Sequence, residues 1–225
     1  MRKDPQKVRS WTWPHYTLAR AALFPALFHC AGGWRVCGRE HVPLRGGALI
    51  AANHVSYMDP PAIGAALPRR TYYFAKKELF QVPIFDWLIR TTYAFPVDRE
   101  GDDKVAFRHA VNLLKEGELL TVFPEGGRSP DGTLQPGGRG AALIAARAGA
   151  PIIPCAVGGT NLLLPPHAKC LHRALIQVSF GPPIETRADD PLHKVGLQEI
   201  TDQVMAEIAR LQAEQAEWRA AQRRR

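Results

Sequence analysis

Short apolar runs recur along the chain from Gly46 to about residue 180, and stretches of helical character separate them. Each run is five or six residues long, nearly continuous in apolar or β-branched residues, and bounded by glycine, proline or charge. The pattern predicts strands at Ala48–Ala52, Thr71–Ala75, Tyr93–Val97, Leu119–Phe123, Ile152–Val157 and Leu175–Phe180. Continuous rather than alternating runs indicate strands covered on both faces, as in a largely parallel or mixed sheet.

Helices are expected between these strands, at Pro60–Leu67, Val82–Arg90, Asp102–Glu116 and Arg139–Ala148. Asp102 is suited to begin the third helix and Gly117 to end it. From residue 192 onward, apolar residues at positions 197, 200, 204, 208 and 211 form one helical stripe. Beyond Leu211 the stripe fades, and we expect a solvated, frayed tail. The alternation predicts a single α/β domain with helices flanking a mostly parallel or mixed sheet.

The N-terminal part does not share this alternation. After a basic start come Trp11, Trp13 and Tyr16, and then the apolar run Ala21–Cys30, which contains Pro25. The run is shorter than the roughly 20 residues that a membrane-spanning helix needs. Aromatic side chains beside cations at one end of such a run favour a helix in the headgroup layer of a membrane. The alternative is a core helix that packs on the domain.

The predicted organisation has three parts. A membrane-interfacial segment occupies residues 1–39, an α/β domain residues 40–191, and a C-terminal helix with a basic tail residues 192–225. A chain of 225 residues is long enough to bury a full core in one such domain.

An excess of basic residues, 29 against 21 acidic, gives a net charge of +8 and predicts a polyanionic neighbour. The candidates are nucleic acid, an anionic membrane surface and phosphorylated substrates. The cations are divided between the termini and the predicted strand ends, without a nucleic-acid reader motif, so no nucleic-acid partner is expected. The four cysteines lack zinc-ligand spacing, which predicts no metal site and suits a reducing compartment.

His54 follows the first predicted strand and lies five residues before Asp59. In a turn that leaves a strand, a carboxylate can hold one ring nitrogen and leave the other free as a general base. Two alternatives remain open: a buried histidine that only bonds a carboxylate, and an aspartate that caps a helix before two prolines. Ser56 lies between them, but the chain has no G-x-S-x-G elbow, so Ser56 is interpreted as a turn residue.

A second cluster, Glu125-Gly126-Gly127-Arg128, follows another predicted strand. Two glycines let backbone N–H groups approach an anion, and the planar guanidinium of Arg128 matches phosphate. The alternative is a glycine turn with a surface Glu–Arg pair of little energetic value.

Two further predicted strand ends carry cations, Lys76 and Arg99. In parallel α/β sheets, ligand sites gather at the carboxyl ends of the strands. If these ends converge with those of the two clusters above, one base faces several cations. The pattern therefore predicts a site that deprotonates a group attached to a phosphate.

Four blocks of the chain resemble, in order and approximate spacing, those of the glycerolipid acyltransferases, most of all the 1-acyl-glycerol-3-phosphate (lysophosphatidic acid) O-acyltransferase type. The blocks are Asn53-His54-x4-Asp59 (the HX4D motif), Phe95-Pro96-Val97-Asp98-Arg99, Phe123-Pro124-Glu125-Gly126-Gly127-Arg128-Ser129 and Ile152-Ile153-Pro154-Cys155-Ala156-Val157. They span nearly half of the chain.

The resemblance implies an α/β core on a helical membrane foot, at the cytoplasmic face of the cell membrane as a peripheral or monotopic protein. It implies acyl transfer from acyl-CoA or acyl-carrier protein to a lysophospholipid hydroxyl, giving phosphatidic acid in phospholipid biosynthesis, without a metal or a further cofactor. His54 would be the general base and Asp59 its orienter. The acceptor phosphate would be bound by Lys76, Arg99, Glu125, Gly126, Gly127 and Arg128, and Pro154 would shape the acyl site.

Two departures from the family pattern concern the acceptor. Gly127 stands where the family usually has threonine, and Gln135–Gly140 replaces a stretch that usually holds an aromatic residue and lysine. A different lysolipid or a lyso-aminolipid therefore remains an alternative acceptor. A lipid-binding protein without turnover is the less favoured alternative, because the His54 and Asp59 pair is intact.

Overall fold

The computed structural model describes residues 17–76, 93–97, 104–165, 168, 170–186 and 194–223. Within them, seven strands form one sheet in the order β1-β7-β6-β2-β5-β3-β4. The strands are β1 (Trp34–Cys37), β2 (Ala48–Ala52), β3 (Thr71–Lys76), β4 (Ala94–Val97), β5 (Leu119–Val122), β6 (Ile152–Gly158) and β7 (Ile176–Phe180). From β4 to β6 the strands are parallel; β7 is antiparallel to β6, and β1 is parallel to β7. The predicted α/β fold with a mixed sheet is confirmed.

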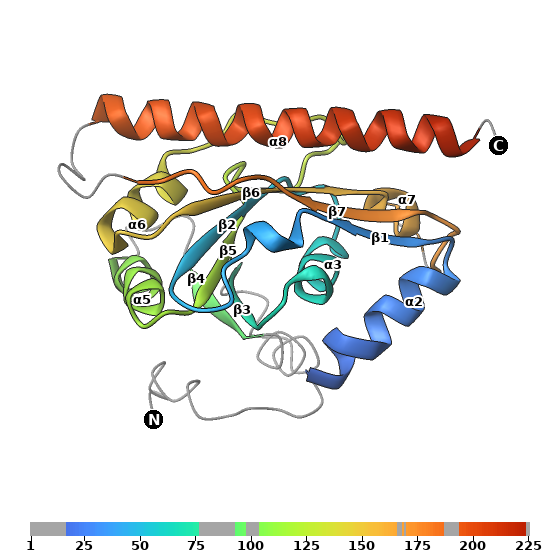
Figure 1. Cartoon of the computed structure of the whole chain (residues 1–225), viewed down its shortest axis with the longest axis horizontal. Coiled ribbons are helices and arrows are strands. Elements are labelled where there is room, and N and C mark those ends of the chain that lie inside the picture. Colours follow the sequence, from blue (N-terminus) through green and yellow to red (C-terminus); the bar gives the residue numbers. More distant parts are fainter. Residues whose placement is uncertain are drawn as a thin grey trace.

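Helices cover both faces of the sheet (Figure 1). One face carries α5 (Lys104–Lys115), α6 (Gly140–Ala148) and α8 (Lys194–Arg223), and the other carries α2 (Phe24–Cys30) and α3 (Asp59–Ala66). The shorter elements are η2 (Ala19–Leu23), η3 (Arg39–His41) and α7 (Thr160–Leu163). Each face of the sheet thus has its own hydrophobic core.

The six predicted strands are all present, with ends within one residue of those expected. Strand β1 is an addition to the prediction. It is a four-residue edge strand with Arg35 inside it, so its sequence lacks the continuous apolar run of the buried strands. Since β1 lies inside residues 1–39, the sheet includes the end of the segment that was assigned to the membrane surface.

The predicted helices near α3, α5, α6 and α8 are present as well. Helix α5 ends at Lys115, and Gly117, the residue expected to end it, follows with φ +87°. There the N–H groups of Gly117 and Glu118 donate to the carbonyls of Leu114 and Leu113, a C-terminal pattern that glycine favours. The predicted helix Val82–Arg90 and the Asp102 cap lie outside the described residues.

Strand β2 is the central strand, between β5 and β6, and all five of its residues are buried. Leu49 and Ala51 belong to the core under α5, α6 and α8, whereas Ala48, Ile50 and Ala52 belong to the core under α2 and α3. Burial of each large apolar side chain contributes about 1.5–3 kcal/mol. A strand buried on both faces therefore requires the continuous apolar run seen in the sequence.

Pro154 lies inside β6, where a residue without an N–H is unusual. It pairs with Ala51 on the β2 side. On the other side, the antiparallel ladder with β7 begins only at Cys155. The carbonyl of Pro154 accepts the N–H of Gly181 (2.8 Å). The interruption of the ladder at Pro154 accommodates the missing donor.

Residues 17–30 form one helical stretch, with π-helical turns at η2 followed by α2. Pro25 has no N–H and would clash with the carbonyl four residues earlier, so a widened turn just before it relieves this conflict. Phe28 is fully buried, whereas Leu18 is 65% and Leu23 61% exposed. The stretch therefore packs on the domain and also presents apolar side chains outward.

None of the helices in the described ranges has the length and hydropathy needed to cross a membrane. The aromatic residues Trp11, Trp13 and Tyr16, on which the interfacial interpretation rests, lie outside those ranges.

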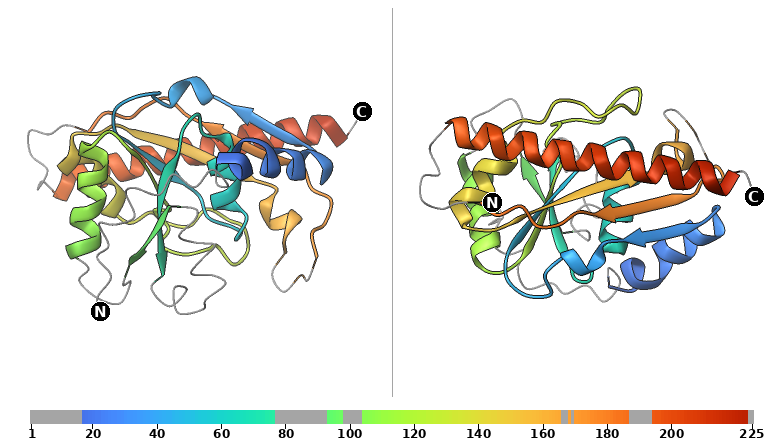
Figure 2. Two further views of the ribbon diagram at one scale, coloured as in Figure 1. Left: turned by 90° about the horizontal axis from the view of Figure 1, so that it is seen from below. Right: turned by 45° about the horizontal axis from the view of Figure 1, so that its top comes forward.

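Helix α8 is 30 residues long and lies across the sheet along β6 and β7 (Figures 1 and 2). The stripe residues Leu197, Val204, Ile208 and Leu211 are buried as predicted. The expected frayed tail is wrong, because the helix continues to Arg223. Buried Gln215 donates to the Ala156 carbonyl (2.9 Å) and the Ser179 hydroxyl (3.0 Å). The guanidinium carbon of Arg35 lies 4.1 Å from the centroid of the Trp218 ring. These polar and cation–π contacts take over where the apolar stripe ends.

Candidate active site

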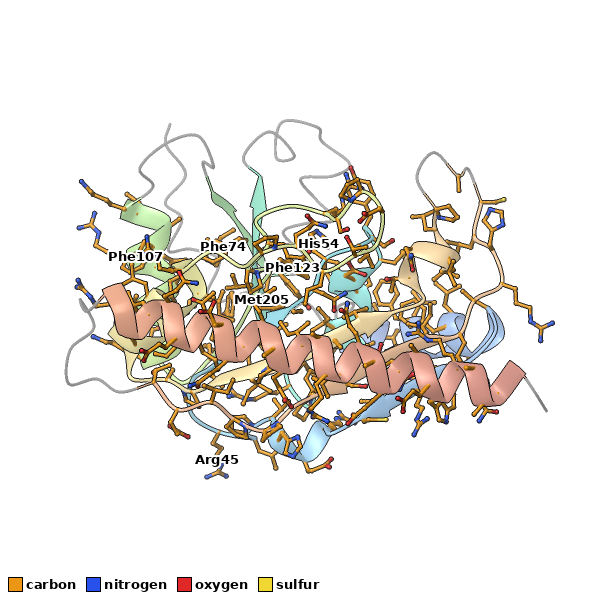
Figure 3. All side chains as sticks on the ribbon, turned by 90° about the horizontal axis from the view of Figure 1, so that it is seen from above. Arg45, His54, Phe74, Phe107, Phe123 and Met205 are labelled. Atoms are coloured by element: carbon orange, nitrogen blue, oxygen red, sulfur yellow. The ribbon has the colours of Figure 1, made fainter. Side chains whose placement is uncertain are left out.

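The segments that follow β2, β5 and β6 meet at one edge of the sheet, because β2 pairs in parallel with both neighbours. His54 follows β2, Phe123 follows β5 and Thr160 follows β6. The His54 ring stacks on the Phe123 ring with 3.9 Å between centroids (Figure 3). The carboxyl edge of a parallel sheet is where ligand sites form, and the central strand places His54 in the middle of that edge.

The carboxylate of Asp59 is completely buried and accepts four hydrogen bonds. Its Oδ2 accepts Nδ1–H of His54 (2.7 Å) and the backbone N–H groups of Val55 (2.7 Å) and Ser56 (2.8 Å). Its Oδ1 accepts the Thr160 hydroxyl (2.5 Å). A buried charge is tolerated only when it is fully bonded in this way, so the carboxylate is held in one orientation.

This geometry favours the tautomer of His54 that a general base needs. Because Asp59 accepts from Nδ1, the neutral ring carries its lone pair on Nε2. The His54 side chain is 13% exposed, so the ring is not sealed from solvent. The helix-cap alternative for Asp59 does not hold, because its carboxylate bonds the amides that precede α3 and the ring of His54.

Two side chains that could act as nucleophiles, Ser56 and Cys155, are both buried. The Ser56 hydroxyl is buried and accepts the backbone N–H of Met58 (3.2 Å), which confirms the predicted turn role. Cys155 is fully buried, and desolvation, with a contribution from the charge of Asp59, raises the pKa of its thiol well above the ordinary value. A thiol that stays protonated is a poor nucleophile.

The turn after β5 forms hydrogen bonds with both the backbone N–H and the backbone carbonyl of His54. The N–H of Ser129 donates to the His54 carbonyl (2.7 Å), and the N–H of His54 donates to Oε1 of Glu125 (2.6 Å). Oε2 of Glu125 accepts the N–H of Gln135 (2.9 Å). Burial raises the pKa of Glu125, and these two backbone donors lower it in part.

Gly126 and Gly127 face open space, since a Cβ on either residue would meet no atom within 4 Å. Gly126 has φ +70°, a conformation that favours glycine, and its N–H donates to the Phe123 carbonyl (3.0 Å). The open side of this turn can accept a ligand group beside His54.

Arg128 extends from the same turn and pairs with Tyr57 of the histidine loop. Its guanidinium carbon lies 3.6 Å from the ring centroid, and its Nη2 donates to the Tyr57 hydroxyl (3.0 Å). Both side chains are exposed, so the pair presents a planar cation to solvent beside the loop that carries His54.

The remaining predicted site residues are Lys76, Arg99 and Pro154. Lys76 is the last residue of β3, separated from β2 by β5, and its side chain lies outside the described part of the chain. Arg99 also lies outside it. Pro154 is inside β6, four residues before that strand ends at Gly158. That the ends of β3 and β4 contribute Lys76 and Arg99 to this cluster therefore stays a prediction.

Three contributions escaped sequence reasoning: Thr160, Tyr57 and the side chain of Asn53. The Asn53 amide bonds the N–H (2.8 Å) and the carbonyl (3.0 Å) of Val157, which joins the ends of β2 and β6. The signal for Thr160 was a hydroxyl directly after the glycines that end a buried strand. That signal has no meaning until β6 is known to lie beside β2.

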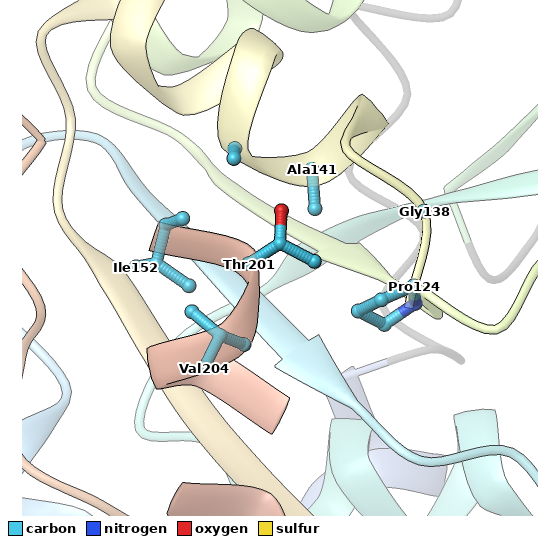
Figure 4. Close-up of a pocket in the computed structure, with 7 residues that line it drawn as sticks. Pro124, Gly138, Ala141, Ile152, Thr201 and Val204 are labelled. Atoms are coloured by element: carbon cyan, nitrogen blue, oxygen red, sulfur yellow. The ribbon is translucent and has the colours of Figure 1, made fainter. Parts of the chain in front are cut away.

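A small apolar pocket lies behind the turn, lined by Pro124, Gly138, Ala141, Ala142, Ile152, Thr201 and Val204 (Figure 4). It lies between the loop after β5, α6, α8 and β6. Among the described residues, no group of three or more histidine, cysteine or acidic side chains is arranged to hold a metal ion.

Proteins of known name are similar to this chain in sequence. A 1-acyl-sn-glycerol-3-phosphate acyltransferase of Bacillus subtilis (strain 168) is 38% identical over 131 residues, 58% of this chain and 65% of the relative. The protein of that name from Streptococcus pneumoniae (strain ATCC BAA-255 / R6) is 29% identical over 206 residues, 90% of this chain and 75% of the relative. The chain thus spans just under two thirds of the length of the first relative.

The fold is similar to the crystal structure of the 1-acyl-sn-glycerophosphate (LPA) acyltransferase PlsC from Thermotoga maritima. The TM-score is 0.71 with 27% sequence identity, and the match covers 95% of this chain and 84% of the other. The family model named Acyltransferase matches residues 33–158, which include His54, Asp59, Glu125 and Arg128. The match extends over more than half of the sequence, and the chain belongs to the acyltransferase family.

Proposed function

We propose that the protein transfers an acyl chain from a thioester to the free hydroxyl of 1-acyl-glycerol-3-phosphate, giving phosphatidic acid for phospholipid biosynthesis. The observation that carries the proposal is the His54 ring held through Nδ1 by a buried, four-times-bonded Asp59. Family membership and the names of the two relatives support the reaction and the acceptor.

In the proposed reaction, Nε2 of His54 takes the proton of the acceptor hydroxyl while its oxygen attacks the thioester carbonyl. The new C–O bond forms, the C–S bond breaks, and the proton passes from His54 to the departing thiolate. Asp59 keeps the ring oriented and stabilises the imidazolium. Base catalysis contributes about 10²–10⁴-fold, and holding both substrates together contributes more. The reaction uses no metal and no cofactor beyond the acyl donor.

Arg128 is the proposed ligand of the acceptor phosphate. Its guanidinium is stacked on Tyr57, beside the open side of the glycine turn and close to the base. Phosphate pairs with a planar guanidinium through two parallel hydrogen bonds. Lys76 and Arg99 follow neighbouring strands and are proposed to add positive charge to the same site.

We also propose that the protein works at the cytoplasmic face of the membrane, where both lipid substrates reside. The exposed Leu18 and Leu23 and the cations that precede them support contact with a membrane surface. Each cation near an anionic lipid surface contributes about 1 kcal/mol.

The test is an acylation assay with a panel of lysolipid acceptors and two labelled donors, acyl-CoA and acyl-carrier protein. We expect labelled phosphatidic acid from 1-acyl-glycerol-3-phosphate, and no product from the His54→Ala variant. Gly127, in place of the family's threonine, keeps a second candidate open, a different lysolipid or lyso-aminolipid acceptor. Product from such an acceptor but not from 1-acyl-glycerol-3-phosphate would replace the proposed acceptor. Labelled lipid bound without product from any acceptor would indicate a binding protein.

A further inference from the structure

Glu125 belongs to the block that the family resemblance assigns to the acceptor phosphate, yet its contacts are with the protein backbone. Oε1 accepts the N–H of His54 (2.6 Å), and Oε2 accepts the N–H of Gln135 (2.9 Å). The side chain is half-buried. A carboxylate beside a bound phosphate would add repulsion between like charges, whereas one bonded to two amides satisfies both donors.

The same turn also holds the other side of the His54 backbone. Ser129 donates its N–H to the His54 carbonyl at 2.7 Å. The peptide groups on both sides of the histidine are therefore fixed by residues of one turn, Glu125 at one end and Ser129 at the other. The stacking of the His54 ring on Phe123 places a third constraint, on the side chain itself.

The far end of the loop is anchored on α8. Gly138 donates its N–H to the Pro124 carbonyl (2.9 Å), and a Cβ on Gly137 would lie 2.7 Å from Sδ of Met205. Pro124 and Gly138 form the wall of the small pocket that faces α8 (Figure 4). Glu125 thus joins the histidine loop to a loop that rests on a long, well-packed helix.

We propose that Glu125 is a positioning residue: its carboxylate fixes the backbone of His54 and the loop at Gln135, and it does not bind the acceptor. The kinetic part of this inference rests on the proposed function, and the structural part does not. Both oxygens must accept, so an ionised carboxylate is required. Glutamine offers one acceptor oxygen and turns an NH₂ group toward the other N–H donor, and aspartate is one methylene too short to reach both.

The experiment compares Glu125→Gln and Glu125→Asp with Gln135→Ala, a matched control that keeps the backbone N–H of residue 135. Hydrogen–deuterium exchange of the full chain in detergent is measured by mass spectrometry, together with kcat and the acceptor KM. In both Glu125 variants we expect faster exchange in the peptides that contain His54 and Gln135. We also expect kcat to fall about 10²-fold, the usual effect of displacing a catalytic group by about 1 Å, and the acceptor KM to stay within about twofold. The control loses only the side-chain bonds from Gln135 to Thr133, so exchange in the peptide that contains His54 should match the wild type.

An acceptor KM raised tenfold or more, with unchanged kcat and unchanged exchange, would overturn the proposal and return Glu125 to the acceptor site. If Glu125→Gln melts below the assay temperature, the Glu125→Asp variant decides by the same readouts. Exchange does not require turnover, so it tests the backbone contacts even where no lysolipid in the acceptor panel is acylated. Failure of the proposed function and failure of this inference are therefore distinguishable.

Discussion

The hydroxyl of Thr160 donates a 2.5 Å hydrogen bond to Oδ1 of Asp59, across 101 positions of sequence. The bond joins the start of α7, which follows β6, to the start of α3, which follows β2, and both residues are completely buried. Asp59 in turn orients His54 through its other oxygen. The support of the proposed base therefore comes from a segment, after β6, that carries no residue of the predicted catalytic pair.

Replacing Thr160 with valine removes the donor while keeping the shape of the side chain. Leaving Oδ1 of buried Asp59 without a partner should lower the free energy of unfolding by about 1–3 kcal/mol. We also expect a reduced kcat, because the carboxylate gains freedom to rotate. Chemical denaturation and steady-state kinetics measure the two effects. Thr160→Ser, which keeps a hydroxyl, is the control, and equal loss in both variants would show that the methyl group matters instead.

His54→Ala should abolish thioester-dependent acylation without unfolding the protein. The loss of general-base catalysis alone is about 10²–10⁴-fold. Ser56→Ala is the matched comparison, because Ser56 accepts a backbone N–H and is not expected to react. Acylation by the serine variant should continue, at a stability cost of about 1 kcal/mol. A dead serine variant together with an active histidine variant would reverse the assignment.

Arg128→Ala should raise the KM for the lysophospholipid far more than the KM for the acyl donor. Arg128→Lys keeps the charge and loses the planar fork, so we expect an intermediate value. Tyr57→Phe keeps the stacking surface and removes the hydroxyl that accepts from Nη2, and it should raise the acceptor KM only slightly. An acceptor KM that is the same in all four proteins would place the phosphate elsewhere.

Gly126 and Gly127 should respond differently to threonine. Gly127 has open space around it and no positive φ, so Gly127→Thr should change the unfolding free energy by less than about 0.5 kcal/mol. Gly126 has φ +70°, and a β-branched residue there should cost about 1–3 kcal/mol. Thermal denaturation compares them. The acceptor panel, run on Gly127→Thr, then reports whether this position sets head-group preference.

Membrane attachment is best tested by deleting residues 2–16, because a longer deletion reaches elements of the fold. Phe28 is part of the core and Trp34–Cys37 pairs with β7, so removing residues 1–39 would destabilise the domain. Loss of the cations and aromatics should weaken sedimentation with anionic vesicles at low salt. Leu18→Ser and Leu23→Ser probe the apolar contribution separately. Undiminished sedimentation in all three variants would contradict the proposed membrane foot.

Much of the fold could be predicted from local sequence. The continuous apolar runs at Ala48–Ala52 and Ile152–Val157 predict buried strands because a strand covered on both faces needs no alternation. The edge strand Trp34–Cys37 escaped prediction because it is short and half-exposed. The last turns of α8 were expected to fray because no apolar stripe continues there. Their contacts instead involve Gln215 and Trp218, which local periodicity does not register.

For the site, the sequence by itself determined which groups stand next to each other along the chain: a histidine five residues before an aspartate, and two glycines beside an arginine. A turn can bring His54 and Asp59 into contact locally, and that predicted contact is present at 2.7 Å. Only the tertiary structure decided the long-range partner of Asp59 and the partners of Glu125. Thr160 reaches Asp59, and Glu125 reaches the His54 backbone, because β2 pairs with β6 on one side and β5 on the other. Strand order arises from packing over the whole sheet, and no local pattern encodes it.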